Sequence, residues 1–192
     1  MAKPDRARMQ AAVRAFLEAA GLDASADVNL RETPERVTEA WADEFLDGYQ
    51  RSAKEALGET YPVPASGKGE LVVVSGIAFH SACPHHLLPY RGVAHLAYVP
   101  NDRVVGFGKL STLVDVLAHR LVLQEDLARE IANALVKELG ALGAACAIRA
   151  EQACLRMRGE EQPHAVTYSE SYAGSMASDA ELRARFIRVV GP

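Results

Sequence analysis

The chain has 192 residues, of which 49% are hydrophobic and 24% are charged, and its formal net charge is −4 at pH 7. This length suffices for one domain with a sizeable core. The acidic balance argues against nucleic acid or a membrane surface as a general partner, because such roles need a basic excess. With no apolar run as long as a membrane span and no secretory signal pattern, we expect a cytoplasmic protein. Three cysteines in such a chain indicate metal ligands or free thiols rather than disulfides.

The N-terminal part of the chain predicts helices. Apolar residues recur with helical spacing from about residue 4 to residue 20, and Thr33-Pro34 is typical of a second helix start. Gly48 is predicted to end that helix. We therefore expect residues 1–50 to form an N-terminal helical segment. A loop-rich lid or linker over residues 51–69 should follow, within a single domain overall.

Residues 70–192 are predicted to form the catalytic domain, with an α+β fold. Strands are expected at residues 71–79, 91–99, 144–158 and 165–172, and helices at 110–121, 124–139 and 179–189. The first two strands should pair as an antiparallel hairpin. The two central helices each carry one apolar face, so they should lie on one side of the sheet. If the third strand is regular, Gln152 and Cys154 point to the same face.

The stretch Cys83-Pro-His-His carries the clearest chemistry. Cys83 and His86 are separated by two residues, so both can reach one metal ion, and thiolate plus imidazole is a zinc-type ligand set. His85 lies between them and is free for proton transfer, since imidazole titrates near neutral pH. A third ligand must come from elsewhere, and Cys154 is the best candidate. A Cys-x-x-His pair alone is also compatible with structural zinc or with chance.

Several short motifs, taken in this order, resemble the GTP cyclohydrolase I family: Thr33-Pro-Glu-Arg36, Cys83-Pro-His-His-Leu-Leu-Pro89, Gly106-Phe-Gly-Lys-Leu110, Gln124-Glu125 and Cys154-Leu-Arg-Met-Arg-Gly159. The resemblance covers about residue 29 to the C-terminus. It implies the tunnelling fold (T-fold), a four-stranded antiparallel sheet with helices on one face. It also implies a toroidal homo-oligomer, a decamer of two pentamers with active sites between subunits. Members of the family open the imidazole ring of GTP at C8, release formate and form dihydroneopterin triphosphate.

The resemblance also implies a metal centre. Cys83, His86 and Cys154 would hold Zn²⁺ and leave a fourth position for water, which is the catalytic rather than the closed structural pattern. Zinc lowers the pKa of such a water, so that it can attack C8 near neutral pH. His85 would act as the general acid/base at a purine ring nitrogen.

Substrate contacts follow from the same resemblance. Glu125, next to Gln124, matches the guanine reader, because a carboxylate accepts hydrogen bonds from both N1–H and the 2-amino group. Adenine does not offer that pair of donors. Three cationic residues match phosphate-binding positions: Lys109, Arg158 and Arg36.

This sequence departs from the family pattern at several positions. Gln152 stands where the family has a second catalytic histidine, and an amide forms hydrogen bonds but transfers no proton at neutral pH. Thr112 stands where the family has a phosphate-binding Arg. Gly108 stands where the family often has Ser, and Pro84 where it usually has Glu. His164 is a candidate to replace the missing histidine.

Three hypotheses stay open at this point. The first is a zinc-dependent hydrolase that converts GTP to dihydroneopterin triphosphate and formate. The second is a divergent paralogue that stops at the ring-opened formamidopyrimidine, or that acts on another purine, such as a less phosphorylated guanine compound or an oxidised purine. The third is a zinc-stabilised structural or regulatory oligomer that binds a purine without consuming it.

Overall fold

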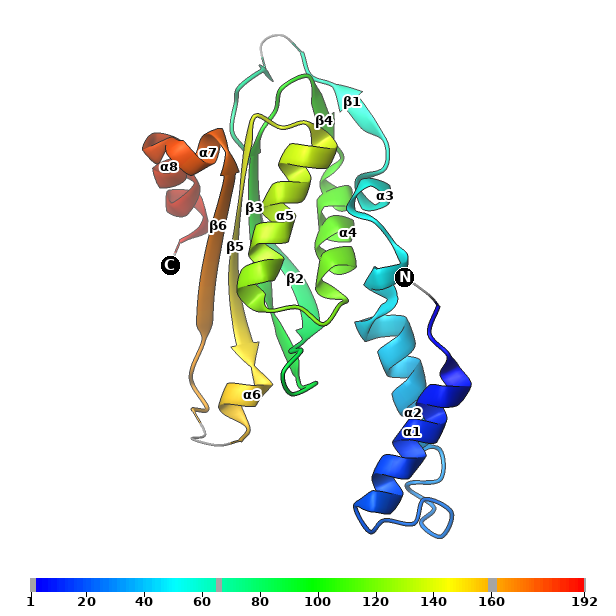
Figure 1. The fold of residues 1–192 in the computed structure, drawn as a ribbon. Helices are drawn as coiled ribbons and strands as arrows, with labels where there is room; N and C mark the ends of the chain where they lie inside the picture. Colours follow the sequence, from blue (N-terminus) through cyan, green and yellow to red (C-terminus); the bar gives the residue numbers. More distant parts are fainter. Residues whose placement is uncertain (1–2, 65–66, 159–161, 192) are drawn as a thin grey trace.

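The computed structural model describes residues 3–64, 67–158 and 162–191. Its centre is a four-stranded antiparallel sheet with the spatial order β2-β3-β5-β6 (Figure 1). The strands are β2 (Val72–Ala82), β3 (Pro89–Val99), β5 (Gly143–Gln152) and β6 (Thr167–Gly174). The predicted α+β class, the four-stranded sheet and the β2–β3 hairpin are therefore confirmed.

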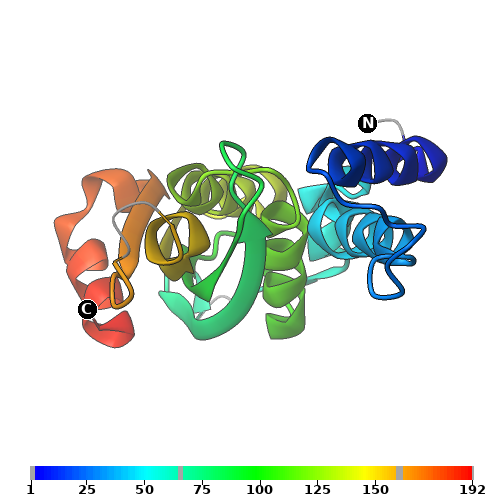
Figure 2. The ribbon, with the colours of Figure 1, turned by 90° about the horizontal axis from the view of Figure 1, so that it is seen from below.

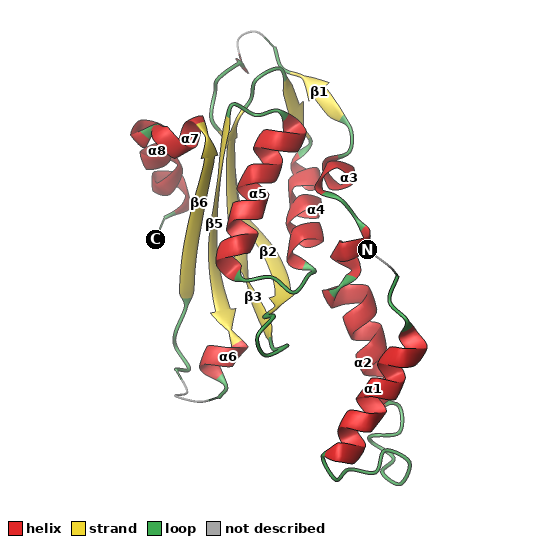
Figure 3. Ribbon diagram, in the orientation of Figure 1, coloured by secondary structure: helices red, strands yellow, loops and turns green. Residues whose placement is uncertain are grey.

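Two helices, α4 (Phe107–Ala118) and α5 (Gln124–Leu139), lie side by side on one face of this sheet (Figure 3). Their apolar stripes are fully buried, as the helical spacing predicts: Leu110, Leu113, Leu127, Ile131 and Leu135. Every second residue of β5 faces them, including Cys146 and Ile148. Gly140 ends α5 in the left-handed conformation that favours glycine.

The opposite face of the sheet is also partly covered, which corrects the expectation of helices on one face only. Two C-terminal helices, α7 (Ser175–Ser178) and α8 (Ala180–Val190), bring Met176 and Phe186 against the other side of β5. There they pack on Ala145 and Ala147. The reason is visible in the strand, which is apolar on both faces over residues 144–148, as in sheets that are buried on both sides.

The N-terminal helices are α1 (Arg6–Ala19) and α2 (Thr33–Ala40), and α2 continues as the π-helix η1 (Trp41–Phe45) and the 3₁₀-helix η2 (Asp47–Gln50). They lie at the opposite end of the molecule from α8 (Figure 2). Gly48 does not end a helix as predicted, because it lies inside η2. A Cβ at this position would be 2.3 Å from the carbonyl oxygen of Val116, so only glycine lets η2 approach α4 this closely.

The connection over residues 51–69 is more ordered than predicted. It contains α3 (Ala53–Leu57), which starts with a Ser52–Glu55 capping box, and β1 (Thr60–Pro62), which pairs with β4 (Arg103–Val105). Residues 159–161 of the turn predicted after the third strand lie outside the described residues. Among the helices that the structure describes, none is long and apolar enough to cross a bilayer.

Candidate active site

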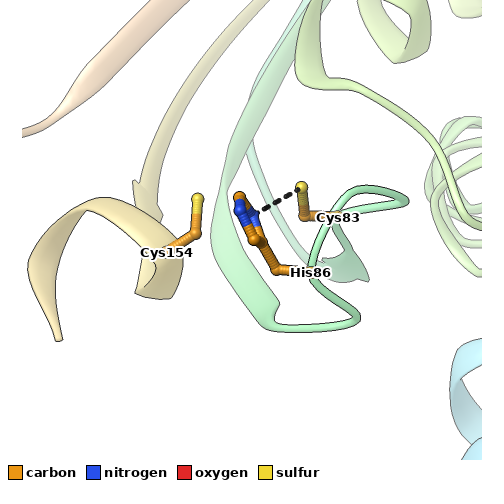
Figure 4. A group of neighbouring side chains, drawn as sticks. All are labelled: Cys83, His86 and Cys154. Carbon is orange, nitrogen blue, oxygen red and sulfur yellow. Dashed lines mark hydrogen bonds between the residues drawn. The ribbon is translucent and has the colours of Figure 1, made fainter. Parts of the chain in front are cut away.

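The loop between β2 and β3 brings two of the predicted ligands together. The backbone N–H of Cys83 donates to Leu88 O at 2.9 Å, and that of Leu87 donates to Cys83 O at 2.9 Å. Leu87 has φ 53°, in the left-handed region that non-glycine residues seldom adopt. This closed turn places Cys83 Sγ and His86 Nδ1 3.9 Å apart (Figure 4).

Cys154 reaches the same place from a helix, not from a strand. β5 ends at Gln152, and the short helix α6 (Ala153–Arg156) begins at once. The prediction of a regular strand through residue 158 is therefore wrong, and Gln152 and Cys154 do not share a strand face. The helical turn directs the Cys154 side chain toward His86 and Cys83 (Figure 4). The ligand atoms of these three residues all lie within 4.8 Å of one another.

The donor set fits a thiophilic divalent ion such as zinc. Tetrahedral Zn²⁺ with its usual bond lengths holds sulfur and nitrogen ligands about 3.6 Å apart, close to the Cys83–His86 separation. Burial, and next the neighbouring Cys83 sulfur, raise the pKa of the Cys154 thiol. Cys83 is buried, Cys154 is half-buried and His86 is exposed, so the cluster is open to solvent on one side, where a further ligand can approach.

A pocket of about 270 Å³ adjoins the cluster. It is lined, among others, by Cys83, His85, Gln124, Glu125, Gln152 and Cys154. His85 and Glu125 are exposed and present their side chains to solvent at this pocket. Tyr90 also lines it, but it is buried and its hydroxyl donates to Val122 O at 3.0 Å. Burial raises the pKa of Tyr90 to about 12, so this residue is a neutral structural group near pH 7.

Gln124, which the sequence predicts to bind substrate, is buried and hydrogen-bonded inside the protein. Its Nε2 donates to Ile148 O at 3.1 Å and to Thr167 O at 3.3 Å. Its Oε1 accepts from Gln152 Nε2 at 2.8 Å and from Thr167 Oγ1 at 2.5 Å. Sequence reasoning missed Thr167, whose place beside Gln124 depends on the β5–β6 register.

The phosphate-binding candidates are only partly brought to the pocket. Arg158 follows α6, is exposed, and lies close enough to Cys154 to lower the pKa of that thiol, against the larger opposing effects. Lys109 lies in the first turn of α4, at the end of the sheet opposite α6 (Figure 1). It is roughly 14 Å from Ala118 along the helix axis. Since the C-terminal end of α4 is the one near the cluster, Lys109 does not reach the pocket of its own chain.

Two further predicted residues lie away from the pocket. Arg36 is exposed on α2, where it forms an ion pair with Glu32. His164 is exposed in the turn before β6 and does not line the pocket. The roles assigned to both residues stay predictions.

The fold and the site define an α+β protein in which two cysteines and one histidine, placed so that they could hold a metal ion, adjoin a pocket lined by both polar and apolar side chains. Comparison with known proteins identifies its family: the model of GTP cyclohydrolase I matches residues 9–191. A GTP cyclohydrolase 1 from Chromobacterium violaceum is 42% identical over 190 residues, covering 97% of this chain and 88% of the relative. One from Ralstonia nicotianae is 40% identical over 190 residues (97% and 87%), and one from Leifsonia xyli subsp. xyli is 41% identical over 187 residues (97% and 96%). The chain belongs to the GTP cyclohydrolase I family.

Proposed function

We propose that this protein is a zinc-dependent GTP cyclohydrolase I, which opens the imidazole ring of GTP at C8 and yields 7,8-dihydroneopterin triphosphate and formate. The observation that carries the proposal is that the cluster of Cys83, His86 and Cys154 adjoins one pocket, which both cysteines line together with the exposed Glu125. A metal cluster and a guanine-reading carboxylate are the two elements that this reaction needs in one place. Family membership and the names of the relatives agree with it.

Each residue of the pocket has a defined task in this reaction. When bound, zinc supplies a water of lowered pKa for the attack on C8. His85 transfers a proton at the purine ring nitrogen that becomes basic when the C8–N bond breaks. Glu125 accepts hydrogen bonds from N1–H and the 2-amino group and so selects guanine over adenine. Gln152 contributes hydrogen bonds but no proton.

The triphosphate requires a second copy of the chain. Lys109 does not reach the pocket of its own chain, and a neighbouring subunit is the natural source of this cation. Two apolar side chains of the N-terminal segment are strongly exposed, Phe16 at 72% and Val28 at 71%, and they suit an interface. In the described part of the chain, the outer edges of β2 and β6 pair with no other strand. We propose a toroidal homo-oligomer, a decamer as the resemblance implies, in the cytoplasm.

The test is incubation of the zinc-loaded protein with GTP. We expect equal amounts of formate and of a pterin that becomes fluorescent after oxidation. If a protein that holds its zinc forms neither formate nor a pterin, the proposal is contradicted.

One observation favours a second function. Gln152 occupies the position of the family's second catalytic histidine, and His164 is exposed outside the pocket. A protein lacking this proton relay would stop at the ring-opened formamidopyrimidine. Mass spectrometry would then detect GTP plus one water without formate, and Gln152→His would restore pterin formation. If neither the wild type nor Gln152→His consumes GTP, a screen of other purines identifies the substrate.

A further inference from the structure

The side chain of Gln124 has no hydrogen-bonding capacity left for a substrate. A glutamine amide offers two N–H donors and two acceptor lone pairs. Both donors are used by the carbonyl oxygens of Ile148 and Thr167, and both lone pairs by Gln152 and the Thr167 hydroxyl. Gln124 is 5% exposed, so water does not compete for these bonds.

This saturation fixes the orientation of the neighbouring amide. Only nitrogen can face two carbonyl oxygens, so the remaining Gln124 atom is the oxygen, and Gln152 must turn its own NH₂ group toward it. Within the described residues, no other hydrogen bond to the Gln152 side chain is formed. The Gln152 side chain lines the pocket, so its Oε1 and its second N–H are left for a ligand there.

The same network joins the two halves of the site. Gln124 directly precedes Glu125 on α5, and Gln152 lies two residues before Cys154. Thr167, on β6, closes the network from the edge of the sheet and also lies 3.1 Å from Ala150 O. A shift of Gln124, Gln152 or Thr167 would therefore change the position of Cys154 relative to Glu125.

We propose that Gln124 is a positioning residue, which acts through Thr167 and Gln152. It holds the Gln152 amide in one orientation in the pocket and keeps Cys154 in register with Glu125. Gln152 then recognises the purine by one donor and one acceptor of fixed direction, neither of which changes charge with pH. The part of this inference that concerns the purine rests on the proposed function, whereas the part that concerns Cys154 does not.

Thr167→Val tests the network, because it removes one hydroxyl and keeps the size and branching of the side chain. The matched control is Ser169→Ala, on the same strand and face, whose hydroxyl lies 3.5 Å from the Gln124 backbone oxygen and does not touch its side chain. Two quantities are measured on the full-length, zinc-loaded protein: the KM for GTP, from the rate of GTP consumption, and the rate at which a chelator removes zinc. We expect Thr167→Val to raise the KM for GTP and accelerate zinc release, each roughly fivefold. Thr167→Ser should restore both, and Ser169→Ala should change neither.

A double-mutant cycle separates positioning from a general structural role. If Thr167 acts through Gln152, Thr167→Val has little further effect on either quantity in a Gln152→Ala background. An undiminished effect in that background, an equal effect of Ser169→Ala, or an unchanged zinc release rate in Thr167→Val would overturn the proposal. Failure of the wild-type protein to consume GTP would instead contradict the proposed function, and the zinc measurement would still decide on the network.

Discussion

Ala82 and Leu121 form a parallel bridge that connects the end of β2 to the segment just before α5. The backbone N–H of Val122 donates to Ala82 O at 3.3 Å, and Ala82 is fully buried. Cys83 directly follows Ala82, and Glu125 lies four residues after Leu121. One backbone junction therefore places the β2–β3 loop, which carries Cys83 and His86, beside the start of α5. A third segment, the β5–α6 corner, adds Cys154.

Removal of one sulfur ligand should weaken zinc binding strongly. We expect Cys154→Ala to weaken zinc affinity by more than about 100-fold, because losing a ligand costs more than losing a residue that only supports one. Cys146→Ala is the matched control, since this cysteine is fully buried on β5 and is not one of the three clustered residues. Competition with a chromogenic chelator measures both affinities. Tight zinc binding by Cys154→Ala would contradict the ligand assignment.

Glu125 should control affinity for guanine. Glu125→Gln replaces one acceptor oxygen by a donor, so we expect the KM for GTP to rise about 10–100-fold, with a smaller change in kcat. The control is Asp126→Asn, the next residue of the same helix turn, whose carboxylate pairs with Arg129. Steady-state kinetics of formate release give both constants. Equal KM values for the two variants would exclude Glu125 as the guanine reader.

The sequence predicts the parts of this molecule that depend on local periodicity. Leu127, Ile131 and Leu135 recur with helical spacing, and α5 has the predicted bounds and buried face. By contrast, residue types alone do not predict where β5 ends, because the alternation typical of a strand continues through Cys154, whereas the strand ends at Gln152. The sequence does predict that Cys154 joins Cys83 and His86, because few thiols are available, and the ligand atoms of these three residues lie within 4.8 Å of one another.

Non-local pairing limits what the sequence predicts. The short strands β1 and β4 lie about 40 residues apart in the sequence. Neither is predicted from its own residues, because each forms a strand only by pairing with the other. Likewise, Thr167 meets Gln124 only through the β5–β6 register, and Lys109 is separated from the pocket by the length of α4. Motif order along the chain carries no information on which chain supplies each residue to a shared site.

The left-handed backbone of Leu87 in the β2–β3 loop predicts opposite effects of two substitutions at this residue. A left-handed backbone costs a non-glycine residue about 1–2 kcal/mol, and a β-branched residue more. Leu87 is 52% exposed, so little packing is lost on replacement. We expect Leu87→Val to lower the free energy of unfolding by about 1 kcal/mol or more, and Leu87→Gly to leave it unchanged or raise it slightly. Denaturant unfolding of the zinc-free protein checks this, and the reverse order of stabilities would contradict it.

An ion pair between β5 and α6 predicts a pH-dependent stability. Arg156 on α6 lies 2.6 Å from the Glu151 carboxylate, and Arg91 lies 3.5 Å from it. The hydrogen bond from Arg156, and the charges of both arginines, hold the pKa of Glu151 below its ordinary value of 4.5. A lowered folded-state pKa stabilises the protein above pH 4.5, and this contribution is lost as the pH falls through the folded-state value.

Glu151→Gln should therefore lower the thermal unfolding midpoint slightly at pH 7 and have no effect at strongly acidic pH. The contribution is small because these side chains are partly solvated. Midpoints of the wild type and the variant, compared across pH 3 to 7, test this. A difference that stays constant over this range would show that the ion pair is not its cause.

The metal site itself is tested most directly by X-ray absorption at the zinc edge of the zinc-loaded protein. The account predicts one zinc per chain with two sulfur neighbours at about 2.3 Å and two lighter neighbours, one of them an imidazole nitrogen, at about 2.0 Å. A spectrum without sulfur, a site with four sulfur neighbours, or much less than one zinc per chain would contradict it.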